Sequence, residues 1–178
     1  MFISQNLLNN YILMTGAPGS KWSSVACDIR LSPEIDKTDE SIERQYNSSS
    51  LNAPAQHIGA YWDPGMEFDI DHKEWDKPFS GTGIKIIKSH TFSLHLHKLK
   101  KYKQPIVMVY RNDVECYRHW VLAGGFDITY PNYKPYYKDL NTMYEKIVQQ
   151  NRNILDFVHD NSIHNDKNIF RVNTKNGL

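Results

Sequence analysis

The sequence lacks the features that mark membrane, secreted and nucleic-acid-binding proteins. Its 178 residues contain no apolar run of about 20 residues, which a membrane-spanning helix needs, and the start "MFISQNLLNN" has no signal-peptide pattern. Charges of the two signs nearly cancel, with 21 Lys and Arg against 20 Asp and Glu, so there is no global attraction to nucleic acid or to an anionic membrane. We therefore expect a cytoplasmic protein that binds neither nucleic acid nor a membrane.

Cysteine is scarce, and no metal-binding motif is present. Cys27 and Cys116 lie far apart, without the spacing of a metal site or of a redox pair, so we expect reduced, packed thiols. The eight histidines include His90, His95 and His97, but no CxxC or HExxH motif accompanies them. We expect solvated surface histidines at 95 and 97, and no metal site.

What the sequence does contain is an alternation of strand and helix patterns over the length of one domain. Short apolar segments predict strands at residues 11–15, 84–88 and 106–110, and "NIFRVNT" predicts a last one. Helical patterns occupy about 20–31, "TFSLHLHKLKKY", about 113–123 and 140–159. This order predicts a single α/β domain over 1–178, with a central parallel sheet covered by helices in a three-layer αβα arrangement.

Polar and basic residues follow three of the predicted strands. "GAPGSKWSS", at residues 16–24, closes the first strand, Lys88-Ser89-His90 ends the second, and Arg111-Asn112-Asp113 ends the third. Glycines let a backbone approach an anion, and the N-terminus of the next helix points free N–H groups at it. Because the carboxyl ends of parallel strands meet at one edge, we expect a cationic pocket there.

The glycine-rich segment departs from the P-loop pattern GxxxxGK[ST], because Lys21 and Trp22 occupy the Gly and Lys places. "GAPGSKWSS" is instead similar to the GAPxSGTT loop of sulfotransferases that use 3′-phosphoadenosine 5′-phosphosulfate as the sulfuryl donor. "IIKSH" resembles their K-[ST]-H segment, and "IVMVYRNDVE" resembles their strand ending in an R-[DN]-P-V-E-like sequence. The order along the chain also fits. The resemblance implies a P-loop NTPase-like fold and transfer of a sulfuryl group to a hydroxyl acceptor, with no metal required.

The resemblance also implies roles for individual residues. His90 would be the general base, with Lys88 and Lys21 stabilising charge at the transferring group. Arg111 would bind the 3′-phosphate, with His119 as a further donor at the place where the family has Ser. The donor-binding residues implied are Gly16, Pro18, Gly19, Ser20, Lys21, Trp22, Ser23, Ser24, Arg111 and His119. Gly19 stands where the family has a basic residue, and Lys21 where it has Gly.

Residues 45–80 interrupt the alternation and have no sustained period. We expect this excursion on the acceptor side, facing a small-molecule or carbohydrate hydroxyl. Its apolar wall would be Trp62, Met66, Phe68 and Trp75, and its hydroxyl-binding carboxylates would be Asp63, Glu67 and Asp69. The alternative is that these aromatics only pack the excursion onto the sheet.

Two other functions remain open. A P-loop NTPase or kinase needs a carboxylate at the end of an apolar strand, whereas the predicted strands end in Lys88 and Arg111, and Asp113 is the nearest substitute. A catalytically inactive nucleotide-binding module is the second alternative, because Lys21 and His119 stand at the family's Gly and Ser places.

Overall fold

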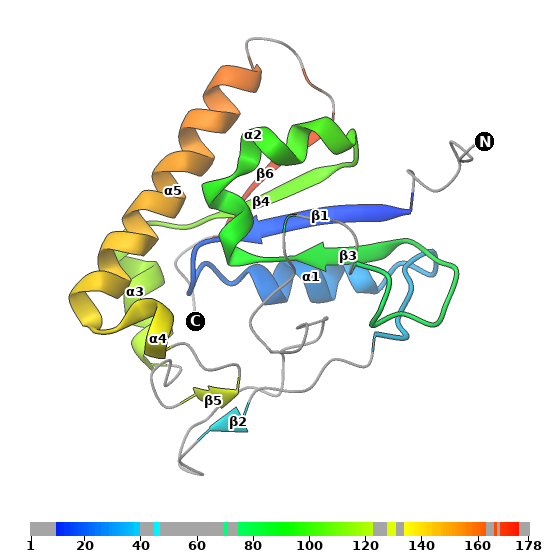
Figure 1. Ribbon diagram of the computed structural model, residues 1–178. Coiled ribbons are helices and arrows are strands. Elements are labelled where there is room, and N and C mark those ends of the chain that lie inside the picture. Colours follow the sequence, from blue (N-terminus) through cyan, green and yellow to red (C-terminus); the bar gives the residue numbers. More distant parts are fainter. Residues whose placement is uncertain are drawn as a thin grey trace.

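Four parallel strands form the central sheet of the protein (Figure 1). The computed structural model describes residues 10–39, 45–46, 70, 75–122, 128–130, 134–162, 166 and 168–174. The strand order is β3 (Lys85–Lys88), β1 (Tyr11–Gly16), β4 (Ile106–Tyr110) and β6 (Ile169–Asn173), and each adjacent pair is parallel. The predicted strands and their parallel pairing are therefore confirmed.

Helices cover both faces of this sheet. One face carries α1 (Trp22–Arg30), and the opposite face carries η3 (His90–Leu94), α2 (Leu96–Leu99), η4 (Lys100–Tyr102) and α5 (Leu140–Ser162). Helix α3 (Asp113–Leu122) packs beside α5, as does the short α4 (Lys134–Tyr137). Apart from the main sheet, β2 (Gln45–Tyr46) pairs with β5 (Ile128–Tyr130) in antiparallel fashion. The architecture is thus α/β, with a parallel sheet flanked by helices.

Alternation along the strands builds two apolar layers. On one face of the sheet, the strand side chains pack against Phe92, Leu96, Leu99 and Ile154; they are Leu13, Ile87, Ile106 and Met108. On the other face, the strand side chains pack against Trp22 and Ala26 of α1; they are Met14, Ile86, Val107 and Val109. Near-continuous apolar strands follow from burial on both faces, which is why these segments show no polar face. A third cluster joins α3, α4 and the first half of α5 around Cys116, Trp120, Tyr137, Met143 and Ile147.

The helical segment at 90–102 is less regular than its apolar spacing predicts. Phe92, Leu96 and Leu99 are buried as expected, but His95 leaves the helical region, with φ −137° and ψ 28°. Instead of one continuous helix, the backbone forms a short α-helix with a 3-10 segment before it and another after it.

The excursion at 45–80 is described only in part. Trp62, Asp63, Met66, Glu67, Phe68 and Asp69 lie outside the described residues. Trp75 is a core residue whose ring contacts those of Tyr11, Phe92 and Tyr102. Trp75 thus packs onto the core near Tyr11, the first residue of β1, as the alternative of core packing expects. Among the described helices, none has the length and apolar character that crossing a membrane requires.

Ile87 tests the two-layer core. It is fully buried in β3, so Ile87→Ala should lower the free energy of unfolding by about 2–5 kcal/mol through lost burial and the cavity left behind. Leu31, which is 79% exposed, is the matched control, and Leu31→Ala should change it by less than about 0.5 kcal/mol. Equal effects in urea denaturation would contradict this placement of the core.

Candidate functional site

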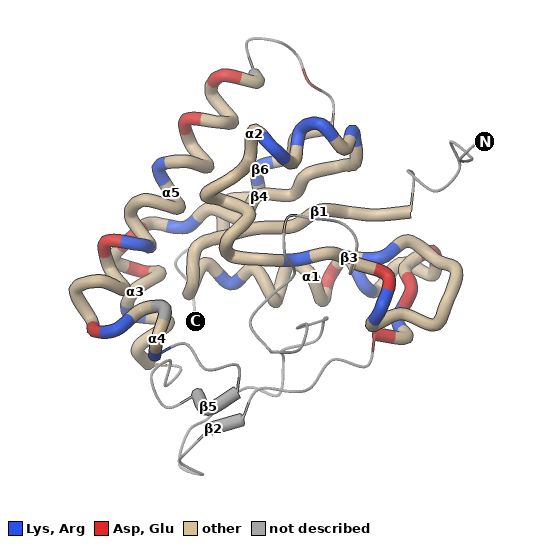
Figure 2. The backbone as a smooth tube through the Cα atoms, in the orientation of Figure 1, with Lys and Arg blue, Asp and Glu red and all other residues tan. Residues whose placement is uncertain are grey.

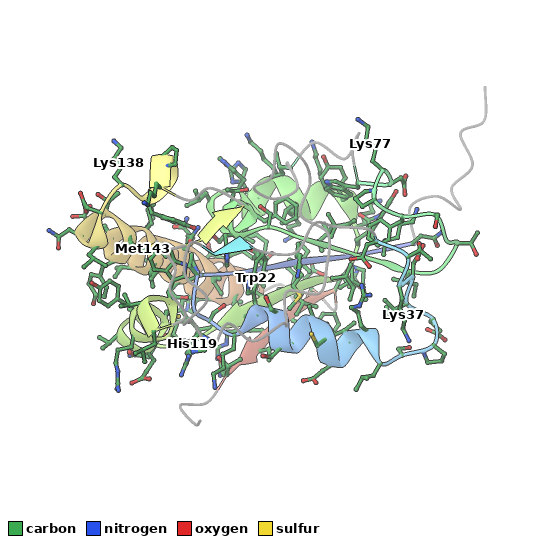
Figure 3. The ribbon with its side chains drawn as sticks, turned by 90° about the horizontal axis from the view of Figure 1, so that it is seen from below. Trp22, Lys37, Lys77, His119, Lys138 and Met143 are labelled. Carbon is green, nitrogen blue, oxygen red and sulfur yellow. The ribbon has the colours of Figure 1, made fainter. Side chains whose placement is uncertain are left out.

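Residues from all three predicted strand ends meet at the glycine-rich loop that follows β1. The His90 Nδ1–H donates to the carbonyl oxygen of Gly16, and Arg111 Nη1 donates to that of Gly19 at 3.2 Å. Since β1 lies between β3 and β4, its loop is the natural meeting point of groups from both neighbours. Figure 3 shows His119 and Met143 toward one side of the molecule and Lys37 and Lys77 toward the other, with Trp22 between them.

The loop depends on two close backbone approaches. At Gly19, which has φ +80°, an added Cβ would lie 1.9 Å from the carbonyl oxygen of Cys116 in α3. At Gly16, a Cβ would lie 2.6 Å from Ser20 Oγ and 2.9 Å from the carbonyl oxygen of Val109. Only glycine fits at either place, because the atoms in the way include backbone. The loop is therefore wedged between β4 and α3.

Lys21 adopts a left-handed conformation, with φ 63° and ψ 24°, at the residue before α1. The sulfotransferase loops that the segment resembles have Gly at this place. The backbone shape that favours Gly is thus present here with a lysine, at an energetic cost of about 1–2 kcal/mol. A cationic side chain therefore begins at the N-terminus of α1, the end of a helix that favours an anion.

His90 is held rigidly in one orientation. It is 3% exposed, and its ring stacks on Trp22 with centroids 3.9 Å apart and planes tilted by 31°. Because a carbonyl oxygen only accepts, the bond to Gly16 requires a proton on Nδ1, so that in the neutral imidazole the lone pair lies on Nε2. The cap of η3 is Ser89, whose Oγ accepts from the Thr91 N–H, so His90 is not needed as a helix cap.

Trp22, at the place of the P-loop lysine, contacts two of the predicted catalytic residues. Its ring stacks on His90 on one side, and Lys88 Nζ lies 5.6 Å from its centroid. Lys88 is buried at the end of β3, as Trp22 is at the start of α1. A cation above an indole face is favoured electrostatically. Trp22 therefore positions Lys88 at the end of β3 and His90 at the start of η3.

Arg111 and Ser20 carry buried polar atoms that lack partners. Arg111 is 5% exposed and forms an ion pair with Glu115 one helical turn later, at 3.6 Å. Neither Arg111 Nε nor Ser20 Oγ finds a hydrogen-bond partner among the described residues. Leaving such a group unpaired costs about 1–3 kcal/mol. Both atoms are suited to an anionic oxygen, which accepts from guanidinium and hydroxyl groups alike.

The remaining predicted residues surround this loop. Pro18 and Ser23 are buried, whereas Ser24 is exposed on α1. His119 is exposed on α3, yet partial loss of hydration and then the nearby positive charges of Arg111 and Lys21 lower its pKa. The influence of both charges on one imidazole places Lys21, Arg111 and His119 at the same edge, where an anion would find three donors.

Buried amides from α5 complete the surroundings. Gln150 Nε2 donates to the carbonyl oxygen of His90 at 3.1 Å, and Asn151 Nδ2 donates to that of Arg111 at 2.8 Å. The sequence analysis did not predict a role for either residue, because amide side chains on a helix of mixed polarity are usually exposed to solvent. The spacing of Gln150 and Asn151 along the helix could have identified them as buried. They lie three and four residues after Ile147 and before Ile154, on the stripe that the helix buries.

Within the part of the chain that the structure describes, no group of three or more His, Cys, Asp and Glu could hold a metal ion. Burial raises the pKa of Cys116 to about 12, so its thiol stays protonated, and Cys27 and Cys116 are both free. Cys116 is packed in the core as predicted, whereas Cys27 is half-buried.

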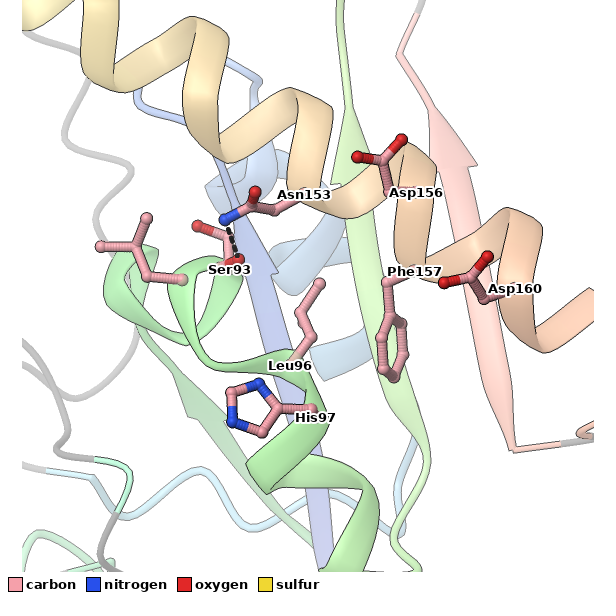
Figure 4. Close-up of a pocket in the computed structure, with 8 residues that line it drawn as sticks. Ser93, Leu96, His97, Asn153, Asp156, Phe157 and Asp160 are labelled. Carbon is pink, nitrogen blue, oxygen red and sulfur yellow. Dashed lines mark hydrogen bonds between the residues drawn. The ribbon is translucent and has the colours of Figure 1, made fainter.

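A surface cavity of about 260 Å³ lies elsewhere, between η3–α2 and the second half of α5 (Figure 4). Its lining residues are Ser93, Leu94, Leu96, His97, Asn153, Asp156, Phe157 and Asp160. No residue of the loop, nor Lys88, His90 or Arg111, lines it. The cavity is therefore separate from the candidate site. Figure 2 shows that Lys and Arg, in blue, and Asp and Glu, in red, are spread over the described chain.

Comparisons of the chain with protein-family models, with curated proteins and with solved structures found no match. The resemblance to sulfotransferases therefore rests on the three sequence motifs. The roles that it implies for individual residues stay predictions.

Gly19→Ala tests the loop geometry. A methyl group at Gly19 meets a backbone oxygen that cannot move aside, at a φ that disfavours alanine. We expect the free energy of unfolding to fall by about 2 kcal/mol or more. Asp28→Ala, on the exposed side of α1, should be close to neutral in the same thermal and urea melts. Equal stability of Gly19→Ala and the parent would show that the loop does not approach α3 as described.

Proposed function

We propose that the protein is a sulfotransferase with a P-loop-like fold, which transfers a sulfuryl group from 3′-phosphoadenosine 5′-phosphosulfate to a hydroxyl of a small molecule or carbohydrate. One observation carries the proposal. A basic residue from each neighbouring strand, His90 and Arg111, hydrogen-bonds to the backbone of the same glycine-rich loop. That arrangement matches the order of motifs from which the resemblance was drawn.

The chemistry of the site fits the donor. Ser20 Oγ and Arg111 Nε are buried donors without partners among the described residues, and an oxyanion would satisfy both. Ser23, Ser24 and the first N–H groups of α1 would hold the phosphosulfate, and Arg111 with His119 would hold the 3′-phosphate. When bound, the donor supplies an activated sulfuryl group.

The protein's own groups then act on charge and protons. His90 Nε2 accepts the proton of the acceptor hydroxyl while that oxygen bonds to sulfur and the bond from sulfur to the 5′-phosphate oxygen breaks. Lys21 and Lys88 stabilise the negative charge left on the phosphate. None of these catalytic roles requires a carboxylate at the end of a strand. Asp113, the nearest one, begins α3 and accepts from Asn151. This use of Asp113 favours sulfuryl transfer over an NTPase or kinase.

An inactive nucleotide-binding module is the second candidate. The burial of His90 and Lys88, 3% and 1% exposed, favours it, because a general base has to meet the acceptor. Transfer to a hydroxyl separates the two candidates, since both would bind the nucleotide.

The first test is ligand binding by calorimetry. We expect 3′,5′-adenosine bisphosphate to bind more tightly than ATP, and to do so without magnesium. Arg111→Ala should weaken the bisphosphate at least about 30-fold, as loss of a buried charge partner does, and 5′-AMP by no more than about threefold. Arg118→Ala is the matched control, because Arg118 also pairs with Glu115 but is exposed. Equal loss for both nucleotides would mean that Arg111 acts only by holding the loop.

The second test separates base catalysis from structure. His90→Asn keeps an N–H near the position of Nδ1, for the bond to Gly16, and removes Nε2. Sulfuryl transfer should fall by about 10²–10⁴, with bisphosphate affinity nearly unchanged. Lys21→Ala should reduce both. A folded His90→Asn protein that transfers sulfate at the parent rate to a verified acceptor would disprove the base assignment. Binding of the bisphosphate with no transfer by the parent would favour the inactive module.

A further inference from the structure

Two consecutive residues of α5 connect the ends of strands that are not neighbours. Gln150 reaches the backbone of His90, which follows β3, and Asn151 reaches the backbone of Arg111, which follows β4. In the sheet, β1 separates β3 from β4. One turn of one helix therefore spans the width of the candidate site.

Asn151 forms more hydrogen bonds with the site than Gln150 does. One amide group donates to the Arg111 carbonyl oxygen at 2.8 Å and to Asp113 Oδ1 at 2.6 Å, so both its N–H groups are used. It thereby holds the end of β4 and the first residue of α3 together. Gln150 shares the His90 carbonyl oxygen with Ser93 Oγ, which donates at 2.7 Å.

Stability alone does not account for these amides. Gln150 and Asn151 are 0% and 1% exposed, on a helix face that otherwise presents Ile147 and Ile154 to the core. Gln150 Oε1 and Asn151 Oδ1 find no hydrogen-bond partner among the described residues. Buried unpaired carbonyl oxygens destabilise a fold, whereas apolar side chains at these positions would not. Local features that weaken a fold concentrate at functional sites.

We propose that Gln150 and Asn151 are positioning residues that fix the separation of the base from the 3′-phosphate arginine. The inference rests on the proposed function of His90 and Arg111. Because both amides belong to one rigid helix, a shift of either strand end relative to the other has to break a buried hydrogen bond. The base and the phosphate-binding guanidinium thus keep one spacing, which a reaction that depends on alignment requires.

The experiment replaces each amide by an apolar side chain of similar size. Gln150→Met should lower kcat for sulfuryl transfer roughly tenfold, with bisphosphate affinity within about twofold of the parent. Asn151→Leu should weaken the bisphosphate roughly tenfold, because Arg111 loses its support. Asn153→Ala is the matched control. Its amide, on the same helix, donates at 3.1 Å to the Ser93 carbonyl oxygen and to neither site carbonyl. It should leave kcat and bisphosphate affinity unchanged.

A second readout does not require catalysis. In protein labelled with 15N-histidine, the Nδ1–H of His90 should exchange with solvent about tenfold faster in Gln150→Met than in the parent, and unchanged in Asn153→Ala. If the parent neither binds the bisphosphate nor transfers sulfate, the proposed function fails, and the exchange rates still decide whether Gln150 holds His90. Identical behaviour of Gln150→Met, Asn151→Leu and Asn153→Ala in transfer, affinity and exchange would overturn the positioning role.

Discussion

The candidate site depends on one constraint, which is that the loop after β1 carries no side chain at Gly16 and Gly19. Without a Cβ, the backbone at Gly19 passes directly over the carbonyl oxygen of Cys116, and Gly16 passes close to β4. The carbonyl oxygens of the same two glycines then accept from Arg111 and His90. The loop is therefore fixed by close contacts with β4 and α3, and its carbonyl oxygens orient both His90 and Arg111. Any side chain at these positions displaces the loop and, with it, the two groups that it orients.

Trp22 and Lys21 together show how the loop differs from a P-loop. A P-loop lysine at position 22 would bring charge to the phosphates from inside the loop. Here that place holds an indole, which supports the His90 ring and the Lys88 ammonium instead. The charge is moved one residue earlier, to Lys21, at the cost of a left-handed lysine backbone. With Lys21 and Trp22 in this order, the carboxyl edge of the sheet keeps a positive charge, and the stack of Trp22 on His90 becomes part of the site.

The sequence was sufficient for most of the sheet but not for the interior of the site. Strand β4 is a continuous apolar run, β1 is nearly so, and β3 places Ile86 and Ile87 between two lysines, so burial on both faces of the sheet explains all three segments. The helix break at His95 was not predictable, because apolar spacing alone does not distinguish an α-helix from 3-10 turns that bury the same side chains. The roles of Gln150 and Asn151 were hidden for a related reason. An amide on a helix is read as exposed unless the partner that it reaches, 40 or 60 residues away, is already known.

The distribution of charge links binding to stability. The chain is almost neutral, yet Lys88 and Arg111 are both more than nine-tenths buried at one edge of the sheet, and Lys21 and His119 stand beside them. Bringing positive groups together in a poorly hydrated place opposes folding, and the ion pair of Arg111 with Glu115 offsets only part of that cost. An anion held between these groups would relieve their repulsion and would accept from Ser20 Oγ and Arg111 Nε, which find no partner among the described residues. A ligand that binds only the folded state at 100 times its Kd adds about 2.7 kcal/mol to stability. The same features that weaken the free protein are therefore those that an anion bound at this edge would stabilise.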